Sequence, residues 1–112
     1  MNKYKIKISS EAVEDLRSIH TYIAFDLQAR QSADDQLNRI RKAIYDLKTF
    51  PFRYRLVDWE PWNSMNIHQF PVENYQFFYH VDEENTTVYV IRIFYSGSDI
   101  EHIINKNTKK DR

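Results

Sequence analysis

The pattern that most constrains this chain is a predicted β-hairpin between Tyr75 and Tyr95. Two runs rich in aromatic and β-branched residues, Tyr75–Val81 and Thr86–Tyr95, flank the polar stretch Asp82–Asn85. Such runs are typical of strands, and a short polar stretch between them suits a hairpin loop. If Val81 lies opposite Thr86, one face carries residues 75, 77, 79 and 81 together with residues 88, 90, 92 and 94. Neither face is polar, which predicts that helices cover one face and that a partner or ligand covers the other.

Residues 3–50 predict one strand and two helices in succession. Lysine and apolar residues alternate over Lys3–Ile8, which is typical of a half-buried strand at a sheet edge. Apolar residues then recur at steps of three and four over Ala12–Leu27 and again over Ala33–Leu47, which predicts two amphipathic helices. Phe50-Pro51 ends the second helix, because proline disfavours a helical conformation in the residue before it. The short break near Asp26–Arg30 makes the pair an antiparallel αα-hairpin.

The rest of the chain adds a loop, an edge strand and a short last helix. Residues 52–64 show no periodic pattern, which predicts a loop. Met65–Val72 predicts a strand that Pro71 places at a sheet edge or a bulge. After the hairpin, Ser98 and Glu101 have the spacing of a capping box for a helix over Asp99–Asn105. The order β-α-α-β-β-β-α predicts an α+β fold, in which the N-terminal αα-hairpin packs on a small antiparallel or mixed sheet.

Composition predicts one domain over residues 1–105, followed by a flexible basic tail over residues 106–112. The chain has no cysteine, which excludes disulfides and thiolate metal sites and favours the reducing cytoplasm. Sixteen basic and sixteen acidic side chains cancel, so no overall attraction to nucleic acid is expected. No apolar run approaches the roughly 20 residues of a membrane helix, and no two histidines have helical ligand spacing. The sequence therefore predicts no membrane partner, no metal and no cofactor.

Several stretches resemble the RelE/ParE superfamily of bacterial toxins. Ala12–Ala24 and Ala33–Pro51 are similar to the first two helices of that family, and Pro71–Asp82 and Val88–Ile93 are similar to its final strands. The resemblance spans residues 3–104 and implies a toxin of a type II toxin–antitoxin module. It also implies a cognate antitoxin, which we expect to be disordered alone and to fold on binding, with an amphipathic helix in a groove.

The superfamily divides by target, and this chain departs from both patterns. RelE-like members cut mRNA in the ribosome, and an arginine usually follows their last strand. Here Tyr95–Asp99 holds no basic residue, and Pro71 and Gln76 stand where relatives carry a strand arginine. ParE-like members poison DNA gyrase and often show a basic residue and an Arg-Asp pair where this chain has His68-Gln69 and Ser98-Asp99. The resemblance therefore implies the fold, but neither inherited mechanism.

Metal-free RNA cleavage needs a base, an acid and a cation beside the phosphate. The catalytic candidates are His102 on the last predicted helix, His68 on a strand, and Arg92 on the face expected to carry Tyr79. Histidine suits acid–base work because its pKa lies near neutral pH. Each candidate has a plainer alternative: an exposed histidine on a short helix, a structural histidine on a strand, and an arginine at a sheet edge.

The predicted loop holds the candidate binding residues Arg53, Arg55, Trp59 and Trp62. Cations interleaved with aromatic rings suit phosphate contacts and base stacking, and the same residue types are enriched at protein–protein hot spots. Alternatively, the tryptophans pack in the core while the arginines stay solvated.

Three functions remain open at the level of the sequence. The first is a ParE-like toxin that binds a protein target such as DNA gyrase. The second is a RelE-like endoribonuclease that cuts mRNA in the ribosome, and the third is an inactive relative that acts as a binding or regulatory subunit. The missing arginines and the zero net charge favour the first and the third.

Overall fold

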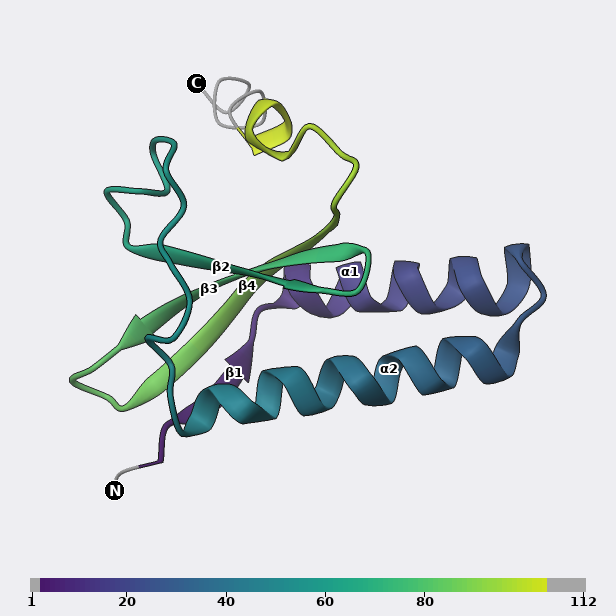
Figure 1. Cartoon of the computed structure of the whole chain (residues 1–112), viewed down its shortest axis with the longest axis horizontal. Coiled ribbons are helices and arrows are strands. Elements are labelled where there is room, and N and C mark those ends of the chain that lie inside the picture. Colours follow the sequence, from purple (N-terminus) through teal and green to yellow (C-terminus); the bar gives the residue numbers. More distant parts are fainter. Residues whose placement is uncertain (1–2, 105–112) are drawn as a thin grey trace.

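A four-stranded mixed sheet forms the centre of the fold (Figure 1). The structure is a computed structural model that describes residues 3–104. The strands β1 (Lys5–Ile8), β2 (Ile67–Val72), β3 (Tyr75–Asp82) and β4 (Thr87–Tyr95) lie in the order β1-β4-β3-β2. β1 runs parallel to β4, whereas the other neighbouring strands are antiparallel. The predicted α+β fold is confirmed, as are the edge positions of the first strand and of the strand that contains Pro71.

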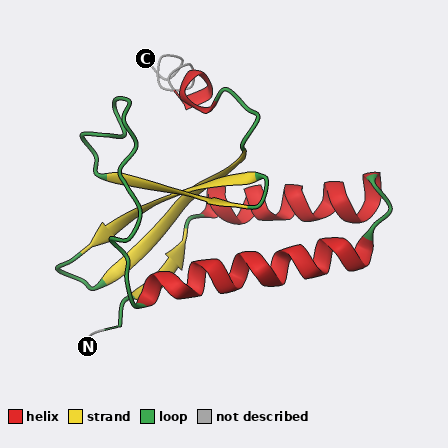
Figure 2. Cartoon of the chain, viewed as in Figure 1, coloured by secondary structure: helices red, strands yellow, loops and turns green. Residues whose placement is uncertain are grey.

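Two long helices form the predicted antiparallel αα-hairpin (Figure 2). α1 (Ser10–Thr21) continues as the π-helical segment η1 (Tyr22–Asp26), and α2 (Arg30–Tyr45) ends in the 3-10 turn η2 (Asp46–Lys48). Ser9 begins α1, because its side-chain oxygen accepts a hydrogen bond from the Ala12 N–H at 3.0 Å. The apolar residues at steps of three and four point toward the sheet, which is why this amphipathic pair packs on it.

The helix side of the sheet, meaning the face covered by α1 and α2, holds the larger core. Its buried members include Ala12, Ile40, Ile44, Leu47, Phe70, Phe77, Tyr79, Val88 and Val90. The Tyr79 hydroxyl lies inside this core and donates a hydrogen bond to the Pro51 carbonyl oxygen at 2.7 Å. That bond satisfies the buried polar atom, while burial raises the pKa of Tyr79 well above its ordinary value. Tyr79 is therefore a structural residue and not an acid or base near neutral pH.

The opposite face, the loop side, is covered by the chain itself. Figure 1 shows the loop between α2 and β2 and the last helical turn on the side of the sheet away from the helices. Val57 and Trp62 from this tryptophan loop (residues 52–66) pack with Phe78 of β3 and Ile104 in a second core. The prediction that a partner or ligand covers this face is therefore wrong where the loop lies, because the chain supplies the cover.

A β-bulge changes the predicted pairing of the hairpin. Val81 pairs with Val88, not Thr86, and the register shifts between Phe78 and Tyr79. Beyond the shift Phe77 pairs with Ile93, so residues 92 and 94 leave the face that carries residues 75, 77 and 79. Helix α1 binds the backbone on both sides of Arg92. The Ser9 hydroxyl donates to the Ile91 carbonyl oxygen at 2.8 Å, and the Ile93 N–H donates to Asp15 Oδ2 at 2.9 Å.

The last predicted helix is present over residues 100–104. Asp99 precedes it, and its Oδ1 accepts a hydrogen bond from the His102 N–H at 3.4 Å. The predicted cap at Ser98 is therefore wrong, because Asp99 occupies the capping position. Asn105 and the predicted tail over residues 106–112 lie outside the described residues. Within residues 3–104, no helix combines the length and the apolar character that crossing a membrane requires.

Candidate functional site

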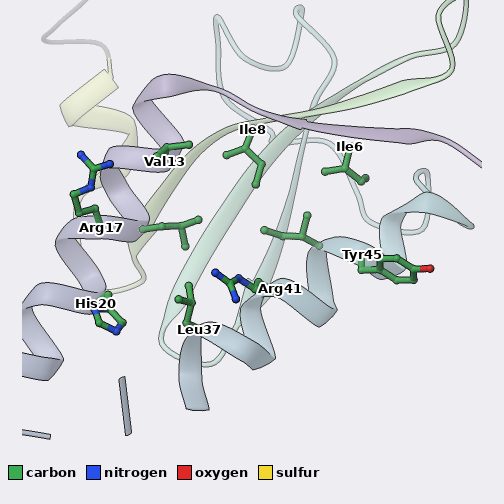
Figure 3. Close-up of a pocket in the computed structure, with 10 residues that line it drawn as sticks. Ile6, Ile8, Val13, Arg17, His20, Leu37, Arg41 and Tyr45 are labelled. Atoms are coloured by element: carbon green, nitrogen blue, oxygen red, sulfur yellow. The ribbon is translucent and has the colours of Figure 1, made fainter. Parts of the chain in front are cut away.

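An open groove of about 510 Å³ lies between α1, α2 and β1 (Figure 3). It is lined by Ile6, Ile8, Val13, Leu16, Arg17, His20, Leu37, Arg41, Ile44 and Tyr45. Figure 3 shows side chains from all three elements pointing into the same space. The lining is mostly apolar, and Ile8 and Val13 keep 38% and 40% of their surface exposed. Concave apolar surfaces of this size are typical of binding sites.

The residues that line this groove lie at the edge of the buried face of each helix and strand. Ile6 and Ile8 occupy one side of β1 because side chains alternate along a strand. Val13, Arg17 and His20 follow one another at steps of three and four, so they share one edge of α1. Leu37, Arg41 and Tyr45 follow one another at steps of four and share one edge of α2. The groove therefore forms where two helix edges meet an edge strand.

The rim of the groove is basic. His20 Nε2 lies 2.8 Å from Asp34 Oδ1, which joins α1 to α2, and Arg17 pairs with Glu14 at 2.6 Å on the exposed surface. The Arg41 guanidinium makes no ion pair or hydrogen bond with any residue in the range 3–104. An apolar floor with an uncompensated arginine favours an acidic, amphipathic partner.

The backbone of β1 adds a second feature to the groove. The backbone N–H groups of Lys5 and Ser9 donate hydrogen bonds to the carbonyl oxygens of Thr86 and Val90, with N···O distances of 2.8 and 2.9 Å. In a parallel ladder the alternate residues turn their backbone groups away, so those of Ile6 and Ile8 point to the open edge. The far edge of the sheet is different, because Val57 N–H bonds to Ile67 O at 2.8 Å and covers β2. β1 is thus available for an added strand at Ile6 and Ile8, while the Tyr4 N–H before it already bonds to the Lys48 carbonyl oxygen.

The predicted binding residues in the tryptophan loop have different surroundings. The Arg53 guanidinium donates hydrogen bonds to the carbonyl oxygens of Phe50 and Asp46 at 3.2 Å each, so it satisfies backbone acceptors in and just after η2. Trp62 is buried and stacks on Trp59 with ring centroids 5.1 Å apart. Arg55 is exposed, and its guanidinium has no partner among the described residues. The binding role of the loop stays a prediction. Arg55 and the half-buried Trp59 suit it best, because their exposed atoms are not needed for packing.

No hydrogen bond or ion pair in the described residues joins one catalytic candidate to another. Arg92 lies on the face opposite Tyr79, so the prediction that they share a face is wrong, because the bulge reverses the alternation of side chains. Its guanidinium instead donates to Asp15 at 2.9 and 3.2 Å and lies 4.3 Å from the Phe94 ring centroid. This half-buried ion pair neutralises the cation that RNA cleavage would require.

The two histidines are likewise separate. His68 is buried, its Nδ1 lies 2.8 Å from the Tyr54 carbonyl oxygen, and its ring stacks on Tyr79 at 4.9 Å. His102 is exposed on the last helical turn. Among the described residues, no hydrogen bond or ion pair joins any two of His68, Arg92 and His102. Over residues 3–104, no cluster of three or more His, Asp and Glu side chains has an arrangement that holds a metal ion.

Sequence reasoning missed the groove. The sequence does contain an indication of it: Val13 and Leu37 are apolar residues next to the main buried face of each helix. That signal becomes a site only when the positions of three separate elements are known. The groove therefore follows from tertiary packing and not from any local motif.

Comparisons with solved structures show the same fold. The structure of the chromosomal ParDE system of P. aeruginosa aligns with a TM-score of 0.67 at 16% identity, covering 83% of this chain and 96% of that one. The RelBE2 toxin–antitoxin complex of Mycobacterium tuberculosis aligns with a TM-score of 0.60 at 18% identity, covering 83% and 98%. A mutant of the E. coli toxin RelE in the free state aligns with a TM-score of 0.59 at 14% identity, covering 96% and 97%.

Sequence comparison identifies the family. No curated protein matches the sequence. A family model described as the ParE toxin of the type II toxin–antitoxin system parDE matches residues 6–100, which is most of the chain. The chain therefore belongs to the ParE toxin family of type II toxin–antitoxin systems.

Proposed function

We propose that this toxin stops bacterial growth by binding a protein target, DNA gyrase, and not by cutting RNA. The observation that carries the proposal is that the charge of Arg92 is already paired. Its guanidinium is held by the Asp15 carboxylate and covered by the Phe94 ring. A cation that is already neutralised stabilises a transition-state phosphate poorly.

The acid–base groups support the same conclusion. His68 is buried, and its ring is held by stacking on Tyr79 and by the Tyr54 carbonyl oxygen. His102 is exposed, but it follows Asp99 and Glu101, whose carboxylates would repel a phosphate. Catalysis requires a base, an acid and a cation on one surface, whereas binding a protein requires only a complementary surface.

The surface best suited to the target is the exposed part of the tryptophan loop. Arg55 has a free guanidinium, and Trp59 shows part of its ring while resting on Trp62. Arginine and tryptophan are enriched among residues that dominate binding energy, and a loop held on a rigid sheet is a common place for them. Arg53 contributes less, because two of its three guanidinium nitrogens already donate to backbone carbonyl oxygens.

The groove between α1, α2 and β1 suits the antitoxin. An amphipathic helix would place apolar side chains over Ile8 and Val13 and carboxylates near Arg41. The open edge of β1 would accept an extended segment of the same chain. Such a segment is disordered alone because its apolar side chains have no core of their own, and it folds as it binds.

Expression in a bacterial host tests the proposal. We expect growth arrest, relaxed plasmid DNA from loss of gyrase activity, and intact mRNA. Cleavage of mRNA on ribosomes with normal supercoiling would replace the proposal with the ribonuclease. Unchanged growth despite soluble, folded protein would identify an inactive relative with a binding or regulatory role. Co-expression of the neighbouring antitoxin gene should restore growth.

A further inference from the structure

A second concave surface lies where the chain leaves η2. This Phe50 pocket has a volume of about 750 Å³ and is lined by Tyr4, Thr49, Phe50, Pro51, Phe52 and Arg53. Phe50 and Phe52 are exposed over 55% and 51% of their surface. Two half-exposed phenylalanines beside a tyrosine are costly to leave in water, so the pocket is a candidate for an apolar anchor.

The pocket has a basic rim. The Arg53 guanidinium lies 5.4 Å from the Phe50 ring centroid, and Lys48 Nζ lies 4.5 Å from the Tyr45 ring centroid. None of the ion pairs found within residues 3–104 involves Lys48 or Arg53. Both cations rest on aromatic rings, so an incoming carboxylate would meet positive charge that no acidic side chain offsets.

Neighbouring stretches of the chain line the Phe50 pocket and the groove. Ile6 and Ile8 line the groove, and Tyr4 at the start of the same segment lines the pocket. The Tyr4 N–H donates to the Lys48 carbonyl oxygen at 2.9 Å, which holds the strand start against η2. Tyr45, which lies under Lys48, also lines the groove. At about 3.3 Å per residue, an extended segment beside β1 covers Ile8 to Ile6 in about three residues. It then leaves the strand edge toward Phe50, because the Lys48 carbonyl oxygen occupies that edge at Tyr4.

We propose that the Phe50 pocket is a second anchor site for the antitoxin. The segment that leaves the groove along β1 inserts an apolar side chain beside Phe50 and places a neighbouring carboxylate near Arg53 and Lys48. The inference rests on the proposed binding of the antitoxin in the groove. It adds that this partner is anchored at two places and that its second anchor combines an apolar residue with an acidic one.

The chain supplies a matched control. Phe25 in η1 is exposed over 56% of its surface and has Arg30 stacked at 5.2 Å, as Phe50 has Arg53 at 5.4 Å. Phe25 contributes to neither the groove nor the pocket. Phe50→Ala and Phe25→Ala therefore remove the same ring from equivalent surroundings, and only the first lies on the proposed path.

Calorimetric titration with the antitoxin that we expect to be encoded beside this gene tests the inference. We expect Phe50→Ala to weaken binding by about tenfold or more, as truncating an interface anchor commonly does, and Phe25→Ala to leave it within about twofold. Lys48→Gln should weaken binding and reduce its salt dependence, because it removes a charge from the rim without removing a ring. Equal melting temperatures of the variants and the wild type exclude misfolding, and Lys48→Gln carries the test if Phe50→Ala does not fold.

The remaining outcomes separate this inference from the proposed function. If the wild type fails to bind the antitoxin, both are overturned. If Val13→Asp in the groove abolishes binding while Phe50→Ala and Lys48→Gln match Phe25→Ala, only the second anchor is overturned. If Phe50→Ala turns a dimer of this protein into a monomer without changing antitoxin affinity, the pocket serves a second copy and the inference is again overturned.

Discussion

The two sides of the sheet are both covered, but they leave different surfaces for partners. On the helix side, α1 and α2 pack on the sheet and leave an apolar groove next to β1. On the loop side, an irregular segment follows the sheet and buries Phe78 under Trp59 and Trp62. The comparison teaches that an aromatic-rich loop can complete a core, while regular amphipathic helices can leave apolar surface open.

The largest expected effect tests whether the loop side is a true core. Phe78 is almost fully buried, and its ring contacts those of Trp59, Trp62 and Phe94. Phe78→Ala should lower the free energy of unfolding by about 3–5 kcal/mol, because it removes a buried ring and leaves a cavity. Denaturant unfolding followed by tryptophan fluorescence measures the loss. A change below about 1 kcal/mol would mean that the loop rests loosely on the sheet.

The next effect concerns the connection between the two sides. Asp15 in α1 accepts hydrogen bonds from the Arg92 side chain and the Ile93 N–H next to the bulge. Asp15→Ala leaves both donors without their partner and should cost about 2–3 kcal/mol of unfolding free energy. Chemical denaturation checks the size of the loss. Stability equal to that of Glu14→Ala, whose partner Arg17 lies on the exposed surface, would contradict the structural role of Asp15.

A charge placed in the groove should separate binding from stability. Val13→Asp should weaken antitoxin binding by about 2 kcal/mol, roughly thirtyfold, because a carboxylate must be desolvated against Ile8. Since Val13 is partly exposed, the melting temperature should change little. Ser18→Asp, on the same helix but outside the groove, is the matched control and should bind normally. Equal affinities of the two variants would remove the groove from the antitoxin interface.

The smallest effect on stability is expected at Arg55. Arg55→Ala removes an exposed side chain without a partner, so the free energy of unfolding should change by less than about 0.5 kcal/mol. Growth arrest should nevertheless weaken, because the guanidinium belongs to the proposed target surface. Titrating inducer against growth rate measures the effect, and Arg30→Ala at the far end of the helix pair serves as control. Equal toxicity of the two variants would exclude Arg55 from that surface.

Sequence periodicity predicts the regular helices and strands and fails at the β-bulge. The steps of three and four in α1 and α2 and the alternation in β1 predict the elements and their buried faces. The bulge between Phe78 and Tyr79 was not predicted, because each residue pair near it suits either register. It depends on Asp15 and Ser9, far away in the chain.

The candidate site was predicted even less completely. Trp59 and Trp62 have no periodic pattern, so sequence alone left their roles in binding and in packing open. The structure places Trp62 in the core and leaves Arg55 free. The groove escaped prediction because Val13, Leu37 and Ile8 become neighbours only through tertiary packing.

The most direct test of the central claim is a supercoiling assay with purified protein and DNA gyrase, run beside a cleavage assay on mRNA in translating ribosomes. Because Arg92 is neutralised by Asp15 and forms no hydrogen bond with His68 or His102, we predict inhibition of supercoiling and no mRNA cleavage. His102→Ala should inhibit gyrase as the wild type does. Cleavage of mRNA that His102→Ala abolishes, with gyrase unaffected, would contradict the account.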